Sequence, residues 1–284
     1  MNPYSKFVGE CARNVVDGRS LPFGGFGPAA RVEIPPDAPK VLFFAPHPDD
    51  ETIQGGLALR LLREAKWNVI DVAVTLGSNP ERKAARWEEL RGACEYLGFG
   101  LESTGPQGLA NVRAATRSKE PRAWGEMVKV IAGLLEKHQP KAIFFPHALD
   151  WNGTHIGVHL LVMDALAAVV SGECYLIETE FWGQMHAPNL MVEYSNETVA
   201  DLVAATSFHA GEVKRNPYHL LIPAWMQDNV RRGAELVGGQ GEAAPQFMFA
   251  QLYRARVWEG EQVQEYLSGG KFLSTSTNLA SLFS

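Results

Sequence analysis

The sequence predicts an α/β fold of the Rossmann-like type, in which a mostly parallel sheet carries helices on both faces. Short apolar runs typical of buried strands alternate along the chain with segments whose apolar residues recur at helical spacing. Residues that favour turns separate these segments. The 284 residues are also enough to bury the core of one large α/β domain.

The first 40 residues are expected to form an extension that packs on the body, because they combine apolar residues with loop-forming glycines and prolines. Residues 41–284 are expected to form a single domain. Its first strand is predicted at 41–44, an uninterrupted apolar run, and its first helix at 52–64, where apolar residues follow a helical period.

A second strand and helix follow the same pattern. Residues 69–76 form another apolar run. Asn79 is a favourable N-cap and Pro80 a favourable first residue, so a helix should begin here and end at Gly98, a typical C-terminal stop. Strands and helices that alternate at this spacing favour a parallel sheet.

The rest of the chain is less regular. Residues 98–119 are weakly patterned and are expected to form a loop. After residue 211 the pattern weakens again, which suggests a C-terminal appendage. Further helices are predicted at 124–138, 155–170, 197–209 and 225–236, and further strands at 142–145, 175–182 and 253–258.

Composition limits the classes of function. A net charge of −6 offers no electrostatic reason to expect nucleic acid or an anionic membrane as a partner. Three cysteines far apart argue against a disulfide framework or a cysteine zinc site and suit a reducing compartment. Because the N-terminus lacks a signal-peptide pattern and no apolar run approaches membrane-spanning length, we expect a cytoplasmic protein.

A polar cluster follows the first strand at its carboxyl end, where ligand sites of open α/β sheets collect. It contains His47, Asp49 and Asp50. Imidazole and carboxylate groups crowded together are costly in a core but suit a divalent metal. We therefore expect His47 and Asp50 to bind an ion and Asp49 to handle a proton. The alternative is a capped helix start, which explains one aspartate but not the whole cluster.

A second polar cluster, from Asp150 to His155, follows the strand predicted at 142–145. In a parallel sheet both clusters face the same edge, so Asp50 and His155 are expected to share a site. His155 and His159 lie at i and i+4 on one helical face, a spacing that lets two histidines bind one zinc ion. Both are therefore candidates for a third ligand.

Three motifs resemble those of the LmbE-like (PIG-L type) metal-dependent N-deacetylases. Residues 45–51 read Ala-Pro-His-Pro-Asp-Asp-Glu, close to the Ala-His-Pro-Asp-Asp-Glu motif of that family. The family's third motif, Asp-x-His-x-Asp-His, begins here with Asp150 and ends with His155, but Asn152 and Thr154 replace its inner residues. The second motif, Thr-x-Gly followed by a helix, is matched by Thr75, Gly77, Arg86, Glu89, Ala93, Leu97 and Gly98.

The resemblance covers residues 41–209 and implies a Rossmann-like fold, a zinc ion and hydrolysis of acetamido groups, commonly on N-acetylglucosamine-type sugars. Carried over by position, the metal ligands would be His47, Asp50 and His155, and the base would be Asp49. This register selects His155 over the second histidine of its helix. Two histidines and a carboxylate are borderline-hard ligands, which suit Zn²⁺ and could also hold Fe²⁺ or Co²⁺.

Several other side chains are candidates for the site. Asn152 stands where the family has the histidine thought to stabilise the oxyanion, and His159 or His186 could supply that hydrogen bond instead. Arg86 and His186 could bind substrate, and Asp150 could orient a ligand histidine. Each also has a purely structural interpretation: a solvated surface arginine, a histidine packed in the core or at the surface, or an aspartate that caps a loop.

The leading hypothesis is a zinc-dependent hydrolase that removes acetyl from an N-acetylated sugar or a related amine, so the expected partner is a small molecule. A metal-dependent hydratase or lyase of a small carboxylic acid could use the same site. A binding domain without catalysis is a third alternative, but retention of the whole His-Asp-Asp-His set argues against it. A homo-oligomer is compatible with each hypothesis.

Overall fold

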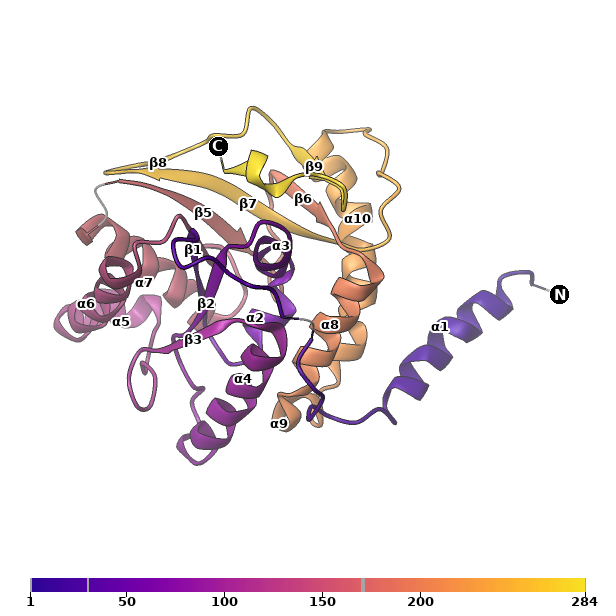
Figure 1. Cartoon of the computed structure of the whole chain (residues 1–284), viewed down its shortest axis with the longest axis horizontal. Coiled ribbons are helices and arrows are strands. Elements are labelled where there is room, and N and C mark those ends of the chain that lie inside the picture. The colour runs from indigo at the N-terminus through magenta and orange to yellow at the C-terminus, as the bar shows by residue number, and fades with distance from the viewer. Residues whose placement is uncertain (1, 30, 170–171, 284) are drawn as a thin grey trace.

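The computed structural model describes residues 2–29, 31–169 and 172–283. In this part of the chain, a nine-stranded sheet has the order β3-β2-β1-β4-β5-β7-β6-β9, with β8 beside β7 (Figure 1). Strands β1 to β5 are parallel to one another, which confirms the predicted parallel sheet. The strands are β1 (Lys40–Ala45), β2 (Asn68–Ala73), β3 (Gly100–Ser103), β4 (Ala142–Pro146), β5 (Glu173–Thr179), β6 (Leu190–Glu193), β7 (Ala250–Glu259), β8 (Val263–Gln264) and β9 (Lys271–Leu273).

The first predicted helix is divided in two. Instead of one helix over 52–64, the structure has α2 (Asp50–Ile53) and α3 (Gly56–Glu64). A Cβ atom added at Gly55 would lie 2.0 Å from the Glu51 carbonyl oxygen, so the close approach of the backbone here requires glycine. The chain can therefore turn sharply directly after the residues of the first motif.

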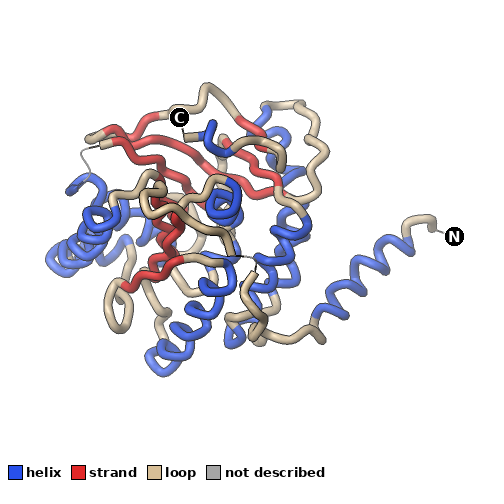
Figure 2. The backbone as a smooth tube through the Cα atoms, in the orientation of Figure 1, coloured by secondary structure: helices blue, strands red, loops and turns tan. Residues whose placement is uncertain are grey.

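Helices cover both faces of the sheet, as expected (Figure 2). In β1, Val41, Phe43 and Ala45 enter one apolar core, whereas Leu42 and Phe44 enter the other. The first core is covered by α3, α4 (Lys83–Leu97) and α8 (Asn196–Ser207), and the second by α6 (Pro121–His138) and α7 (Gly153–Val169). No helix in the described residues is long and apolar enough to cross a membrane. The expected helix end at Val170 lies outside the described residues.

The expected loop over 98–119 is wrong at two places. It contains β3, the edge strand beside β2, and the short helix α5 (Ala114–Lys119). No residue of β3 is buried, and its sequence Gly-Leu-Glu-Ser has no apolar run. Its pairing with β2 therefore depends on backbone hydrogen bonds that the sequence pattern does not reveal.

The C-terminal region continues the same sheet. Strand β7 is antiparallel to both β5 and β6, so it joins the two parts of the sheet. Helix α10 (Ile222–Gly238) covers this end, where its Val230 and Val237 share a small core with Met191 and Leu252. The expected C-terminal appendage is thus built onto the edge of the main domain.

The N-terminal extension has two different halves. Helix α1 (Ser5–Gly18) has no buried residue and projects from the body (Figures 1 and 2). Further on, Val32 and Ile34 pack against the main core, and the Ala29 amide donates to the Tyr96 carbonyl over 3.1 Å. The second half thus packs on the core, and the end of α1 lies against residues 218–221, where a Cβ atom added at Gly18 would meet the Leu220 side chain.

Candidate metal centre

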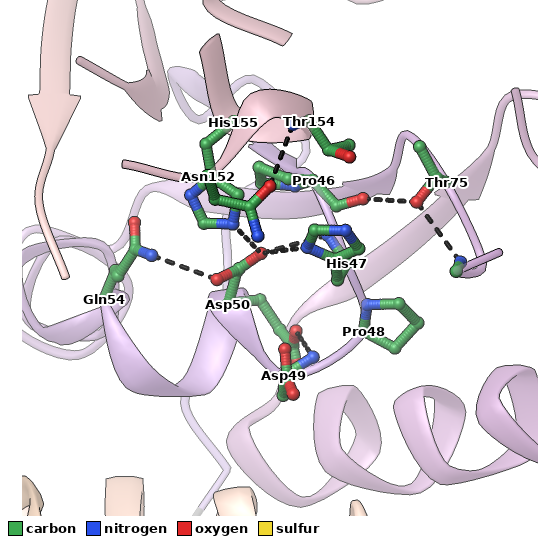
Figure 3. Close-up of polar contacts among 12 residues, drawn as sticks. Pro46, His47, Pro48, Asp49, Asp50, Gln54, Thr75, Asn152, Thr154 and His155 are labelled. Carbon is green, nitrogen blue, oxygen red and sulfur yellow. Dashed lines mark hydrogen bonds and ion pairs between the residues drawn. The ribbon is translucent and has the colours of Figure 1, made fainter. Parts of the chain in front are cut away.

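Two strand ends bring the polar clusters together. Strands β1 and β4 are parallel neighbours, so the residues that follow them meet at one edge of the sheet. His47 lies just beyond β1, Asp50 opens α2, and His155 lies in the first turn of α7 (Figure 3). These three side chains point toward one another although His47 and His155 are 108 positions apart in the sequence.

The three side chains have the spacing of a cation site. Asp50 Oδ2 lies 3.3 Å from His155 Nε2 and 3.5 Å from His47 Nδ1. One potential ligand atom from each residue lies within 4.8 Å of the other two. Zinc bonds of about 2.0–2.1 Å in a tetrahedron place neighbouring ligand atoms roughly 3.3 Å apart. Both ring nitrogens of His155 are buried without a hydrogen bond. The donor set therefore fits a divalent cation.

Asp50 is held ready to carry a negative charge. Its Oδ2 accepts the His47 backbone N–H over 3.0 Å, and its Oδ1 accepts from Gln54 Nε2 over 3.1 Å. Burial alone would raise the pKa of Asp50, but His155 and His47 lower this pKa below its ordinary value. Burial opposes protonation of His155, but Asp50 and Asp150 raise its pKa to about 10. A cation bound here would therefore displace a proton.

Asp49 is held beside this group in an unusual conformation. Its φ of 123° is rare for any residue other than glycine. Its backbone N–H donates to Glu51 Oε2 over 2.8 Å, and its Oδ2 accepts from the Tyr218 hydroxyl over 2.5 Å. Burial and the negative charge of Asp50 raise the pKa of Asp49 to about 6. A carboxylate of this basicity suits proton transfer near neutral pH.

A buried ion pair supports the loop below Asp49. Glu51 is fully buried, and its Oε1 lies 2.8 Å from His209 Nε2. Burial lowers the pKa of His209, but Glu51 raises it more, so the net shift is upward. Glu51 thus links the backbone of Asp49 to His209, which follows the end of α8. Sequence reasoning assigned no role to Tyr218, since it is 169 residues from Asp49 and lies in no motif.

The second cluster supports the centre from the opposite side. Asp150 Oδ2 lies 3.5 Å from His155 Nδ1, and Asp150 Oδ1 accepts the Asn152 backbone N–H over 2.7 Å. Asn152 Oδ1 in turn accepts the Thr154 backbone N–H over 2.8 Å. The side-chain NH₂ of Asn152 is therefore left as the donor available to a ligand.

A cleft of about 440 Å³ opens onto these groups. Its walls include His47, Asp49, Asn152, Arg86 and Trp182. Arg86 Nη2 donates to the Pro48 carbonyl over 3.0 Å, so this arginine both braces the first motif and borders the cleft. The structure thus brings six of the sequence-predicted residues close together at the centre (His47, Asp49, Asp50, Asp150, Asn152 and His155) and Arg86 to its border.

Two predicted histidines lie elsewhere. His159 Nδ1 is 3.0 Å from the Pro146 carbonyl oxygen and 3.3 Å from Glu178 Oε1. Burial lowers the pKa of His159 to about 4, so it is neutral at pH 7. His186 is exposed. Among the described residues, neither histidine belongs to the His-Asp-His group or borders the cleft.

Fold and site together define a Rossmann-like α/β protein with a His-Asp-His group that could hold a metal ion and with a carboxylate of raised pKa beside it. Residues 42–166 match the family model described as PIG-L: GlcNAc-PI de-N-acetylase. This match confirms the resemblance seen in the motifs for that part of the chain. A search of curated proteins gives no match.

Solved structures share the fold at low sequence identity. N,N'-diacetylchitobiose deacetylase from Pyrococcus horikoshii is 18% identical, with a TM-score of 0.56 over 77% of this chain and 84% of its own. The 4-carboxy-2-hydroxymuconate hydratase of Pseudomonas putida KT2440 is 17% identical, with a TM-score of 0.54 over 76% and 95%. A zinc-inhibited form of teicoplanin deacetylase is 14% identical, with a TM-score of 0.53 over 77% and 98%.

Proposed function

We propose that this protein is a metal-dependent N-deacetylase that hydrolyses the acetamido group of an N-acetylated sugar or a related amine. The family supports N-deacetylase activity. The observation that carries the proposal is the His47–Asp50–His155 group with Asp49 beside it. Two imidazoles and one carboxylate favour Zn²⁺, with Fe²⁺ or Co²⁺ as alternatives.

The chain's own residues have distinct roles in this reaction. A divalent cation held by His47, Asp50 and His155 would supply a Lewis acid that polarises the amide carbonyl and acidifies water. Asp49 takes the proton of the attacking water and delivers it to the leaving amine as the C–N bond breaks. The products are acetate and the free amine. Asp150 holds the His155 ring in orientation through Nδ1.

Two residues position the substrate in this proposal. Asn152 donates a neutral hydrogen bond to the developing oxyanion, in place of the family histidine. Arg86 borders the cleft and binds a hydroxyl or an anionic group of the substrate. Because His159 contacts the carbonyl oxygen of Pro146, the last residue of β4, its proposed role is to support the end of this strand.

Metal content and acetate release together test the proposal. We expect about one divalent ion per chain by elemental analysis and acetate release from N-acetylglucosamine or its oligomers, lost on chelation and restored by Zn²⁺. Asp49→Asn should keep the metal and lose about 10²–10⁴-fold in turnover. Asp50→Asn should lose the metal itself. Full activity in exhaustively chelated protein, or normal turnover by Asp49→Asn, would contradict the mechanism.

A hydratase acting on a small carboxylic acid is the second candidate. The replacement of the family histidine by Asn152 favours it, and a hydratase shares the fold. The two activities differ in product, because a hydratase adds water to a double bond and releases no acetate. Measurement of acetate and of ultraviolet absorbance from a conjugated acid on the same preparation separates them.

A further inference from the structure

A second chamber lies beside the cleft. It has a volume of about 380 Å³ and shares His47, Arg86 and Asn152 with the cleft. Its other walls include Lys83 at the start of α4 and residues 109–113, which precede α5. Since His47 borders both spaces, a molecule at the candidate metal centre can extend into this chamber.

The walls of the chamber are positively charged. Lys83, Arg86 and Arg113 border it, and no aspartate or glutamate of the described part of the chain does. The whole chain, by contrast, carries a net charge of −6. Positive charge is therefore concentrated locally, and a concave wall with one sign of charge focuses the field on what enters it.

Lys83 and Arg113 differ in their partners from the arginines of the neighbouring cleft. There, Arg82, Arg86 and Arg215 converge on the Glu212 carboxylate at 2.8, 3.7 and 2.5 Å. In the chamber, Lys83 Nζ donates to the Gln107 carbonyl over 2.8 Å. Among the described residues, Arg113 has no hydrogen bond or ion pair through its side chain. Within the described ranges, Lys83 and Arg113 thus have no carboxylate partner.

We propose that this chamber binds an anionic group of the substrate, a phosphate or a carboxylate, through Lys83 and Arg113. This inference rests on the proposed function, because it places the acetamido group at the metal centre and the anion in the adjoining space. Charged N–H donors make their strongest hydrogen bonds to such oxyanions. A neutral sugar would leave both cations without a counter-charge, so the preferred substrate class is an acidic N-acetylated sugar or amine.

Paired substrates test the inference in the metal-loaded full-length protein. N-acetylglucosamine is the neutral substrate, its 1- and 6-phosphates carry phosphate, and N-acetylmuramic acid carries a carboxylate. We expect kcat/KM to be higher for at least one anionic substrate than for the neutral one. In Lys83→Gln/Arg113→Gln, the ratio of anionic to neutral kcat/KM should fall by about tenfold or more.

The matched control is Lys66→Gln/Arg122→Gln, which removes the same charge from exposed positions. Lys66 Nζ also donates to a backbone carbonyl, that of Arg63, over 3.0 Å. This control should keep the wild-type ratio, and thermal unfolding should show that both double variants are folded. An unchanged ratio in Lys83→Gln/Arg113→Gln, or an equal fall in the control, overturns the inference.

A binding measurement separates this inference from the proposed function. If no substrate releases acetate, the proposed function fails, and calorimetric titration with inorganic phosphate decides the chamber alone. We expect the Kd to rise about tenfold in Lys83→Gln/Arg113→Gln and to stay unchanged in the control. Because phosphate bound at the metal centre would contribute equally to all three proteins, equal Kd values overturn the anion site.

Discussion

At the scale of single residues, Asp49 is under the tightest local constraint of the site. It combines a φ of 123° with a backbone bond to Glu51 and a side-chain bond from Tyr218. Strained backbone persists where surrounding contacts over-determine it. The Tyr218 hydroxyl therefore fixes the direction in which the proposed base faces the cleft.

Replacing Tyr218 by phenylalanine should impair turnover through Asp49. A hydrogen bond to a charged group contributes about 1.5–3 kcal/mol, so we expect kcat to fall by roughly 10- to 100-fold. Metal content and the melting temperature should stay near wild-type, because Tyr218 contacts none of the three proposed ligands in the hydrogen bonds described. A wild-type kcat in Tyr218→Phe would show that the bond does not orient the base.

A second prediction at this scale concerns Asn152 and the two histidines that lie away from the cleft. The sequence leaves Asn152, His159 and His186 as candidate oxyanion donors. Of these three described residues, Asn152 alone borders the cleft. Asn152→Ala should therefore lose about 10²–10³-fold in kcat, whereas His186→Ala should retain it. All variants are compared at equal metal content. A larger loss of kcat in His159→Ala or His186→Ala than in Asn152→Ala would identify that histidine as the oxyanion donor instead.

At the scale of elements, the break between α2 and α3 is stabilised by a distant strand. Gln251 Oε1 accepts the Gly56 N–H over 3.1 Å, and the Tyr253 hydroxyl accepts the Leu57 N–H over 3.1 Å. Gln251 Nε2 also donates to the Ile53 carbonyl over 2.6 Å. Side chains of β7 thus bond backbone groups that the interrupted helix leaves free.

Gly55→Ala should be destabilising because its methyl group meets the Glu51 carbonyl oxygen. Overpacking of this kind costs about 1–3 kcal/mol in the free energy of unfolding. The matched control is Gly133→Ala in α6, where an added Cβ meets nothing within 4 Å. This substitution should be neutral or should raise the free energy of unfolding by up to about 1 kcal/mol. Urea unfolding measures both. Equal effects would show that the break does not need glycine.

Helix and strand assignments from sequence were reliable where local chemistry decides them. Asn79 accepts the Glu81 N–H over 3.0 Å, and Gly98 ends α4 with a φ of 85°, both as their residue types predict. Strand β3 and helix α5 were missed, because one is a short edge strand and the other a single short helix without an apolar period. The sheet supplies the partner that stabilises β3.

At the scale of the whole molecule, the burial of His159 makes the free energy of unfolding depend on pH. His159 has a pKa of about 4 in the folded state because burial disfavours its charged form, against 6.5 for an unperturbed histidine. The unfolded chain therefore binds a proton first as the pH falls. The contribution of neutral His159 is present above pH 6.5 and is lost as the pH falls through about 4.

His159→Asn should flatten this dependence, since its side-chain amide can still donate to the Pro146 carbonyl but does not titrate. The free energy of unfolding of the wild type should fall between pH 6.5 and 4 by roughly 3 kcal/mol more than that of the variant. Chemical unfolding at several pH values measures the difference. Parallel curves would mean that His159 is not neutral in the folded state.

The sequence by itself determined the α/β class, the order of the main strands and helices, and the proposed ligands at the carboxyl ends of two strands. These properties follow from apolar periodicity and from residues that act on their near neighbours. Only the tertiary structure decided that Tyr218 bonds Asp49, that β7 bonds the break before α3, and that Lys83 and Arg113 border one chamber. Each of these joins residues from separate elements, whose distance is set by how the helices pack on the sheet.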